Sequence, residues 1–139
     1  MATTQKRIDS CYNPIMKIKQ ILKEINLDPD PLKDQFFLTD QEILDQIADL
    51  ANLNNSDTVL EIGAGPGNLT KELAKKAGKV IAIEIDEKFR PLLSQLPDNV
   101  EVRISDADKH VKQGGKFYKT KEYNKIVSNL PYSIAEWFL

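Results

Sequence analysis

The sequence has a single cysteine, Cys11, and a single histidine, His110, among its 139 residues. One cysteine cannot form an internal disulfide, and this usage suits a reducing compartment. Because one histidine and one distant cysteine provide neither a zinc-ligand set nor a histidine-based triad, we expect no metal and place His110 at the surface. No stretch approaches the roughly 20 apolar residues that span a bilayer, and residues 1–10 lack the apolar core of a signal peptide. These absences predict a cytoplasmic protein with no membrane partner.

The order of hydrophobic patterns predicts an α/β fold, with a helical extension over residues 1–32 and the main domain over residues 33–139. Helical spacing predicts a helix from about Pro14 to Ile25, and Thr39 with Glu42 predicts a capped helix that begins at Asp40. Apolar runs predict four strands, over 58–62, 80–84, 100–104 and 123–128, and helices over 69–77, after Asp86 and over 133–139. Strands that alternate with helices indicate right-handed crossovers and a parallel sheet.

Lysines are concentrated between residues 109 and 125, although the net charge of the whole chain is −2. Glu122 is the only acidic residue in that segment, whose lysines are Lys109, Lys112, Lys116, Lys119, Lys121 and Lys125. The segment is either a solvated loop or an RNA-facing surface, and the sequence leaves both interpretations open.

A glycine-rich turn follows the first predicted strand, in the segment Glu61-Ile62-Gly63-Ala64-Gly65-Pro66-Gly67. Glycines at this place let the backbone turn sharply and let a ligand lie against it without interference from a Cβ. The spacing is G-x-G-x-G, and not the G-x-G-x-x-G of dinucleotide dehydrogenases. The alternative is a turn that serves only to connect the strand with the next helix.

Acidic residues follow the second and third predicted strands. Glu84 lies about 20 residues beyond the glycines, where a carboxylate can accept hydrogen bonds from ribose hydroxyls or can cap the following helix. Asp106, in Ser105-Asp106-Ala107, can accept a hydrogen bond from the exocyclic amine of an adenine. The carboxyl ends of parallel strands line one crevice, so the sequence predicts an adenosyl site there.

The segment Asn129-Leu130-Pro131-Tyr132 follows the fourth predicted strand, beside the same crevice. The Asn129 side-chain oxygen and the carbonyl of Leu130 or Pro131 can hold both hydrogens of a planar amine such as adenine N6. The Tyr132 ring offers a face on which an extruded base can stack. The alternative is an ordinary turn with a packing tyrosine, but together with the glycine turn the segment indicates methyl transfer to adenine N6.

Five segments in this order resemble the ribosomal RNA adenine dimethyltransferases, which put two methyl groups on each of two adjacent adenines of the small-subunit RNA. The segments are Gln35-Phe36-Phe37-Leu38, the glycine turn from Glu61 to Gly67, Ile83-Glu84-Ile85-Asp86, Ser105-Asp106-Ala107 and Asn129-Leu130-Pro131-Tyr132-Ser133-Ile134. The resemblance implies a Rossmann-like methyltransferase fold with S-adenosylmethionine (SAM) as the cofactor. Leu130 favours the branch that acts on the small subunit, because the macrolide-resistance methylases more often resemble Asn-Ile-Pro-Tyr.

The resemblance also implies a set of site residues. The cofactor-binding residues would be Gln35, Leu38, Glu61, Gly63, Ala64, Gly65, Gly67, Glu84, Ile85, Asp106, Ala107 and Asn129. The catalytic residues would be Asn129, Leu130, Pro131 and Tyr132. Three positions depart from the usual pattern. Asp34 stands where glycine precedes the glutamine, Phe36 stands where asparagine or histidine follows it, and Ser105 replaces a common glycine.

Members of this family continue through further strands and a helical RNA-binding domain, so the sequence resembles an N-terminal fragment of such a protein. We therefore expect SAM-dependent dimethylation of adenine N6 in small-subunit ribosomal RNA, within a pre-ribosomal particle, from the complete protein. The alternatives are a catalytically inactive SAM- or RNA-binding module and an NAD-dependent dehydrogenase.

Overall fold

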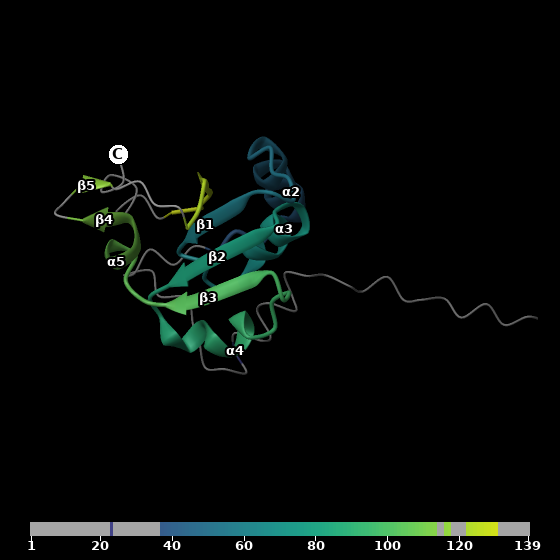
Figure 1. Cartoon of the computed structure of the whole chain (residues 1–139). Coiled ribbons are helices and arrows are strands. Elements are labelled where there is room, and N and C mark those ends of the chain that lie inside the picture. Colours follow the sequence, from purple (N-terminus) through teal and green to yellow (C-terminus); the bar gives the residue numbers. More distant parts are fainter. Residues whose placement is uncertain (1–22, 24–36, 114–115, 118–121, 131–139) are drawn as a thin grey trace, which may run out of the picture.

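A four-stranded parallel sheet forms the centre of the computed structural model, which describes residues 23, 37–113, 116–117 and 122–130 (Figure 1). Its strands are β1 (Thr58–Ile62), β2 (Lys79–Glu84), β3 (Val100–Ile104) and β6 (Lys125–Ile126), in the order β3-β2-β1-β6. In this register Val59 of β1 lies between Val80 of β2 and Lys125 of β6. The α/β class and the parallel pairing predicted from the sequence are therefore confirmed.

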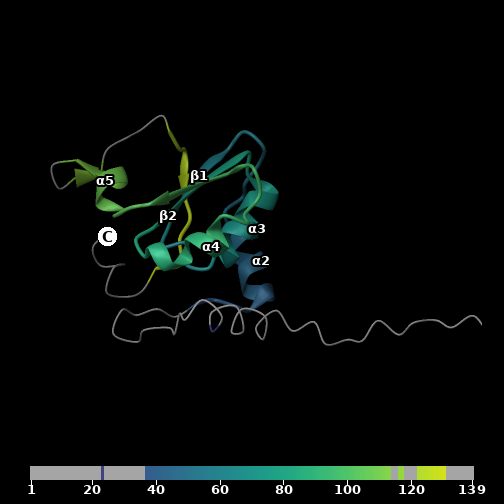
Figure 2. The ribbon, with the colours of Figure 1, turned by 90° about the horizontal axis from the view of Figure 1, so that it is seen from below.

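Helices cover one face of the sheet, as Figures 1 and 2 show from two sides. α2 (Gln41–Leu50) packs beside α3 (Asn68–Lys76), which connects β1 with β2. Between β2 and β3, a single 3-10 turn, η2 (Glu87–Phe89), leads into α4 (Arg90–Leu93). After β3, α5 (Asp108–Val111) and the hairpin of β4 (Lys112–Gln113) and β5 (Lys116–Phe117) lie toward the carboxyl ends of the strands (Figure 1).

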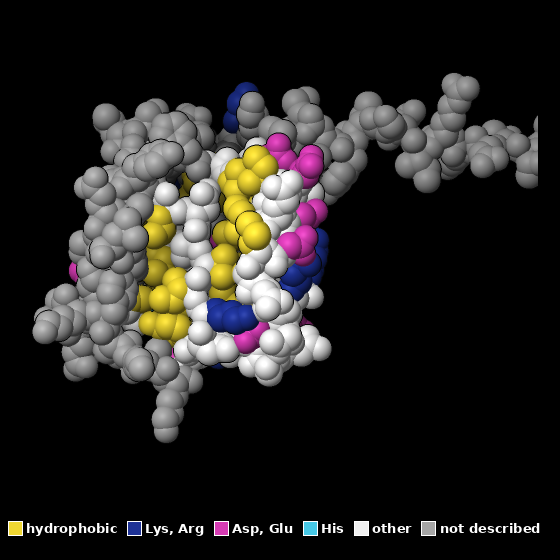
Figure 3. Space-filling view, turned by 90° about the horizontal axis from the view of Figure 1, so that it is seen from above, with side chains coloured by type: hydrophobic (Ala, Val, Ile, Leu, Met, Phe, Trp, Pro, Cys, Tyr) yellow, Lys and Arg dark blue, Asp and Glu magenta, His cyan; other side chains and the backbone are white. Residues whose placement is uncertain are grey.

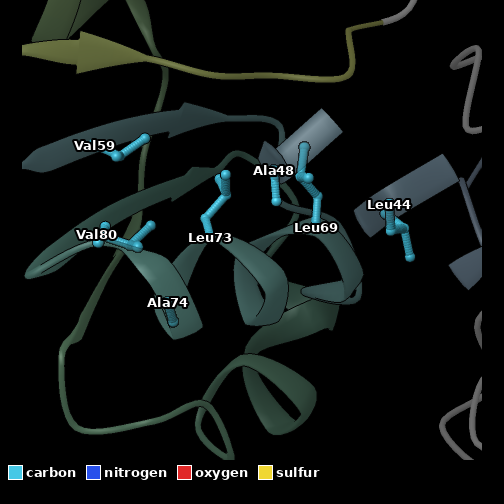
Figure 4. Close-up of a cluster of buried hydrophobic side chains, with 8 residues drawn as sticks. Leu44, Ala48, Val59, Leu69, Leu73, Ala74 and Val80 are labelled. Atoms are coloured by element: carbon cyan, nitrogen blue, oxygen red, sulfur yellow. The ribbon is translucent and has the colours of Figure 1, made fainter. Parts of the chain in front are cut away.

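The largest buried cluster lies between the helices and the sheet (Figure 4). It contains Leu44 and Ala48 of α2, Leu69, Leu73 and Ala74 of α3, Ala77, and Val59 and Val80 of the sheet. A second cluster on the opposite face consists of Leu60, Ile62, Ile81 and Ile83 with Val111 of α5. Because both faces of the central strands are covered, these strands are continuous apolar runs rather than alternating ones.

A polar network joins the amino ends of β1 and β6. Asp57, the residue before β1, is 4% exposed, and its carboxylate accepts hydrogen bonds from the Asn124 side chain at 2.7 Å and the Lys125 ammonium at 3.1 Å. The same carboxylate accepts the backbone and side-chain N–H groups of Asn54 at 2.8 and 2.9 Å. These bonds, the one from Asn124 above all, lower the pKa of Asp57. Since Asn124 also accepts the Thr58 N–H at 2.8 Å, the network determines where β6 begins against β1.

Some of the predicted element boundaries are wrong. The carboxylate of Asp40 accepts the Glu42 and Ile43 N–H groups at 3.0 and 3.3 Å, so Asp40 and not Thr39 caps α2. The fourth predicted strand, 123–128, is paired in the sheet only over Lys125–Ile126. The helix expected after Asp86 is a 3-10 turn followed by one short α-helix. Of the helix expected from Pro14 to Ile25, only Lys23 lies within the described residues, and it is helical; the helix expected over 133–139 lies outside them.

Hydrophobic side chains are visible on the face of the molecule that Figure 3 shows from above. The large hydrophobic residues that remain exposed include Leu50 at the end of α2 and Ile126 on β6. Within the described part of the chain, no helix has both the length and the apolar character that crossing a membrane requires.

Candidate active site

The turn after β1 contains three glycines with left-handed backbone conformations. Gly63, Gly65 and Gly67 have φ angles of +72°, +54° and +85°, which residues with a side chain rarely adopt. A Cβ at Gly65 would lie 3.3 Å from the Phe37 ring, and a Cβ at Gly63 would lie 3.7 Å from Leu130. Gly63 is also exposed, so its backbone is a surface that a ligand can approach closely.

The backbone amides of this turn are already hydrogen-bonded within the protein. Gly63 and Ala64 both donate to the Ile83 carbonyl at 2.8 and 3.1 Å, and Gly67 donates to the Ala64 carbonyl at 2.9 Å. The Gly65 N–H donates to the Glu84 carboxylate at 2.7 Å. A loop that cradles phosphate instead directs free N–H groups at the ligand. The glycine turn is therefore poorly suited to bind a phosphate.

Glu84 connects the turn to the ends of β2 and β3. Its carboxylate is 6% exposed and accepts the Asp86 N–H at 2.9 Å as well as the Gly65 N–H. Two hydrogen bonds leave further lone pairs on the two carboxylate oxygens, so Glu84 can accept more. Its backbone carbonyl accepts the Ser105 N–H at 2.8 Å, which brings the residues after β3 beside the end of β2.

Ile85 and Asp106 present two exposed side chains beside Glu84. Ile85 is 71% exposed, which is unusual for a large apolar residue next to a buried strand. Asp106 is exposed, and one of its carboxylate oxygens accepts the Asp108 N–H at 3.0 Å at the start of α5. An apolar surface beside a hydrogen-bond acceptor suits a flat heterocycle that carries an amine.

Glu61 is buried near the end of β1, directly before the turn. It is 2% exposed, and its Oε2 atom has no hydrogen-bond partner among the described residues. Burial raises the pKa of Glu61 to about 8, even though the nearby Thr70 hydroxyl favours the ionised form; the Glu84 carboxylate adds to the increase. An unsatisfied buried carboxyl is costly to the fold, and such groups are concentrated at functional sites.

The segment before α2 is held against the glycine turn. The Phe37 ring meets the Phe89 ring edge to face, with centroids 5.4 Å apart and planes at 82°. The next residue, Leu38, accepts a hydrogen bond through its carbonyl from the Asn68 side chain at 3.0 Å. Leu38 was among the site residues expected from the sequence, whereas Phe37 and Asn68 were not. Phe37 could have been identified from the sequence, because it lies inside the segment Gln35-Phe36-Phe37-Leu38 that resembles the family.

On the other side of the turn, Ser128 anchors the segment that follows β6. Its hydroxyl oxygen accepts the Ile62 N–H at 2.9 Å, and the Val127 N–H donates to the Leu60 carbonyl at 3.0 Å. Asn129 is exposed, whereas Leu130 is half-buried against the second cluster. Ser128 was not among the candidate residues expected from the sequence, although it directly precedes Asn129.

The described candidate residues therefore gather at the carboxyl ends of the strands. These are Leu38, Glu61, Gly63, Ala64, Gly65, Gly67, Glu84, Ile85, Asp106, Ala107, Asn129 and Leu130. Gln35, Pro131 and Tyr132 lie outside the described residues.

His110 is half-buried, so the surface position expected for it is met only in part. Its Nε2 atom is buried without a hydrogen-bond partner in the described residues, and its Nδ1 atom lies 3.4 Å from a guanidinium nitrogen of Arg103. Burial and the Arg103 charge lower the pKa of His110. Arg103 also pairs with Glu101 and Glu122, so His110 belongs to a network on β3 and α5.

Of the six lysines in the lysine-rich segment, the structure describes the side chains of Lys109 and Lys125, and these two are placed differently. Lys109 is exposed on α5, but the Lys125 ammonium is bound at the amino end of the sheet, to Asp57 and to the carbonyls of Ala51 and Asn52. The side chains of the other lysines of this segment lie outside the described part. Lys125 therefore stabilises the amino end of the sheet.

A family profile of ribosomal RNA adenine dimethylases matches residues 32–139. The chain belongs to this family. Relatives at 40–44% identity over 121 residues are the probable ribosomal RNA small subunit methyltransferases A of Methanosarcina mazei and Thermococcus sibiricus. Those alignments cover 85% and 86% of the chain but 41% of each relative, so the chain spans less than half of their length.

Two solved structures share the fold of this dimethylase chain. The 23S rRNA methyltransferase ErmE matches with a TM-score of 0.59 and 34% identity, over 74% of the chain and 41% of that protein. A dimethyladenosine transferase from Plasmodium falciparum matches with a TM-score of 0.56 and 36% identity, over 73% of the chain and 36% of that protein. The Rossmann-like methyltransferase fold expected from the sequence is thereby confirmed.

The residues at the strand ends fit a cofactor such as SAM. The turn provides the close backbone approach at Gly63, Ile85 and Asp106 suit an adenine, and the acceptor Glu84 suits a ribose. The buried carboxyl of Glu61, with its unsatisfied oxygen, suits a positively charged group. In the described residues no group of histidine, cysteine and acidic side chains is arranged to hold a metal ion.

Proposed function

We propose that the complete protein is a SAM-dependent dimethyltransferase that acts on adenine N6 of small-subunit ribosomal RNA, in the cytoplasm and within a pre-ribosomal particle. Membership of the dimethylase family and relatives named as small-subunit methyltransferases support this function. Because the chain spans 41% of those relatives, we assign the activity to the whole protein.

The observation that carries the cofactor assignment is the polarity of the glycine turn. Its N–H groups are used inside the protein, one of them by the Glu84 carboxylate, and a second carboxyl, that of Glu61, is buried directly before the turn. A dinucleotide such as NAD needs free N–H donors for its pyrophosphate, whereas an acidic residue at the position of Glu84 can bind the ribose of either cofactor. SAM has no phosphate and carries positive charge, so the turn favours SAM over NAD.

The bound cofactor would supply an electrophilic methyl group. We assign the Asn129 side-chain oxygen and the carbonyl of Leu130 or Pro131 as acceptors for the two N6 hydrogens of the target adenine, which directs the nitrogen lone pair toward the methyl donor. Ser128 holds this segment against β1 through the Ile62 N–H. An adenine amine needs orientation more than a strong base, and His110 lies in the Arg103 network on β3 and α5 rather than beside Asn129. Pro131 and Tyr132 would complete the target pocket.

Calorimetric titration of the 139-residue chain with SAM and with NAD tests the cofactor. We expect SAM to bind and NAD to give no heat. Glu84→Ala should weaken SAM binding by about 1–3 kcal/mol, the cost of losing a charge-assisted acceptor. The control is Glu87→Ala, three residues along, whose carboxylate is exposed and pairs with Arg90. Equal SAM affinity in the wild type and Glu84→Ala would contradict the ribose assignment, and NAD binding would favour the dehydrogenase.

A SAM- or RNA-binding module without turnover is the second candidate, because the chain covers only part of its relatives. A single-turnover assay with small-subunit RNA and radiolabelled SAM distinguishes the two. Transfer of label by the complete protein but not by residues 1–139 would assign the chain to binding and the remainder of the protein to RNA capture. Transfer by the 139-residue chain itself would reject the second candidate.

A further inference from the structure

We propose that Glu61 makes the cofactor site selective for charge: the residue is neutral in the free protein and ionises when the cationic cofactor binds. This inference rests on the proposed SAM function and deepens it. SAM carries a positive sulfonium that its demethylated product, S-adenosylhomocysteine, lacks. A site that gains a negative charge on binding therefore holds the substrate form more tightly than the product form.

The first support is the solvation of the Glu61 carboxyl. The residue is 2% exposed, and its Oε2 atom is buried without a hydrogen-bond partner among the described residues. Ionisation of a carboxyl in such surroundings is strongly unfavourable unless a cation compensates for it. The pKa of Glu61, raised to about 8 by burial, agrees with this geometric argument.

The second support comes from the charged groups that surround Glu61. On β2 the neighbouring group is the carboxylate of Glu84, a like charge that disfavours a second anion. On α3 the nearby group is the Thr70 hydroxyl, while Glu72 pairs with Lys75 at 2.6 Å. On β6 the Lys125 ammonium is bound to Asp57 at the opposite end of β1. The described surroundings thus contain no cation that pairs with Glu61, and a bound ligand could supply one.

The third support is the position of Glu61 in the chain. It directly precedes the turn whose first glycine, Gly63, is exposed, and its neighbour Ile62 bonds to Ser128 beside Asn129. A unit charge about 8 Å away, at an effective dielectric constant of about 20, changes the proton affinity of a carboxyl by more than tenfold. Direct contact is therefore unnecessary for coupling.

Binding of the cationic cofactor is coupled to the release of one proton from Glu61, so charge is conserved. The neutral carboxyl of Glu61 loses its proton to the buffer as the cation enters, and the carboxylate remains with the bound cation. By linkage, SAM affinity rises with pH between about pH 6 and pH 8.5, while the affinity of S-adenosylhomocysteine rises less. We expect the ratio of the two affinities to increase about tenfold over that range.

The test measures dissociation constants of both ligands at pH 6 and pH 8.5, together with proton release at pH 7 from titrations in two buffers of different ionisation enthalpy. The proteins are the wild type, Glu61→Gln and Glu72→Gln. Glu72 is a second buried glutamate on the same side of the sheet, but it has a lysine partner. SAM and S-adenosylhomocysteine also have groups that gain or lose protons with pH. Their contribution is the same for all three proteins, so it cancels when the proteins are compared.

We expect the wild type and Glu72→Gln to release protons with SAM, to release fewer with S-adenosylhomocysteine, and to show the pH-dependent ratio. Glu61→Gln should show neither effect. Equal proton release for both ligands, or an unchanged ratio in Glu61→Gln, would overturn the inference while leaving SAM as the cofactor. Failure of the wild type to bind SAM would overturn the proposed function as well. The wild-type titrations decide the matter even if Glu61→Gln does not fold.

Discussion

The two ends of β1 each carry a buried carboxyl, and they differ in how that group is satisfied. At the amino end, Asp57 is 4% exposed and accepts hydrogen bonds from Asn124, Asn54 and Lys125. At the carboxyl end, Glu61 is 2% exposed, and its Oε2 atom has no partner in the described part of the chain. A buried polar group with partners stabilises a fold, whereas one without partners weakens it. The first end thus stabilises the fold, whereas the second is where we propose that a ligand binds.

A pair of asparagines repeats this contrast around β6. Asn124, before the strand, uses its amide group to bond Asp57 and its oxygen to bond the Thr58 N–H. Asn129, after the strand, is an exposed residue beside the glycine turn. The residue type is therefore uninformative about its role, and the hydrogen-bond partners distinguish a structural asparagine from a candidate catalytic one.

The largest expected effect comes from replacing these two asparagines in the complete protein. Asn129→Ala should lower the single-turnover rate of methyl transfer by about 100-fold or more, because an acceptor that orients the amine is lost, while RNA binding stays nearly intact. Asn124→Ala should leave the rate of the folded protein unchanged but reduce the free energy of unfolding by about 1–2 kcal/mol. Methyl-transfer assays and urea unfolding measure the two quantities. A near-normal rate for Asn129→Ala would place the chemistry elsewhere.

Opposite pH dependences of stability form the second prediction. Because the pKa of Glu61 is raised, the folded state holds the proton of this carboxyl more tightly than the unfolded state, so stability is highest below about pH 4.5 and falls as the pH rises toward 8. Glu61→Gln should therefore gain stability over the wild type between pH 5 and pH 8, on the order of 2–4 kcal/mol.

The lowered pKa of Asp57 has the opposite sign, since its contribution is present above about pH 3.8 and is lost as the pH falls through the folded value. Asp57→Asn should remove part of the acid-induced loss of stability that the wild type shows. Urea midpoints from pH 3 to pH 8 measure both slopes. The same slope for the two variants would erase the distinction between the ends of the sheet.

A smaller effect is expected from Phe37, which holds the segment before α2 on the glycine turn. Phe37→Ala removes the contact with Phe89 and the packing against Gly65, so unfolding should become easier by about 1–3 kcal/mol and SAM affinity should fall. Ile43→Ala, a partly exposed position on α2, should change both quantities little. Unchanged SAM affinity in Phe37→Ala would show that the segment has a structural role only.

The smallest expected effect is a difference in SAM affinity between substitutions of two exposed isoleucines, Ile85 and Ile126. Ile85→Ser should weaken SAM binding by about 1 kcal/mol, because an apolar surface for the adenine is lost, and should leave stability nearly unchanged because the side chain is 71% exposed. Ile126→Ser, on β6, should not alter SAM affinity. Calorimetry measures both variants, and an equal loss in the two would mean that Ile85 makes no specific contact.

The sequence predicted the fold in its main features because apolar strands, a glycine turn and helical spacing are local patterns. It placed the strands 58–62 and 100–104 correctly and the start of the second within one residue. It failed where competing polar groups decide a boundary. Asp40 and Thr39 are both good caps, and β6 is short because Asn124 and Ser128 bond to β1 on either side of it.

The sequence by itself determined the family, the order of the elements and the candidate residues at the strand ends, since these depend on residue types and spacing along the chain. Only the tertiary structure decided which of the two carboxyls at the ends of β1 has hydrogen-bond partners. Asp57 meets Asn124 and Lys125, which are 67 and 68 residues away, while no such partner reaches the Oε2 atom of Glu61 in the described residues. Burial and hydrogen bonding are properties of the folded arrangement, because both depend on segments that are distant in the chain and adjacent in space.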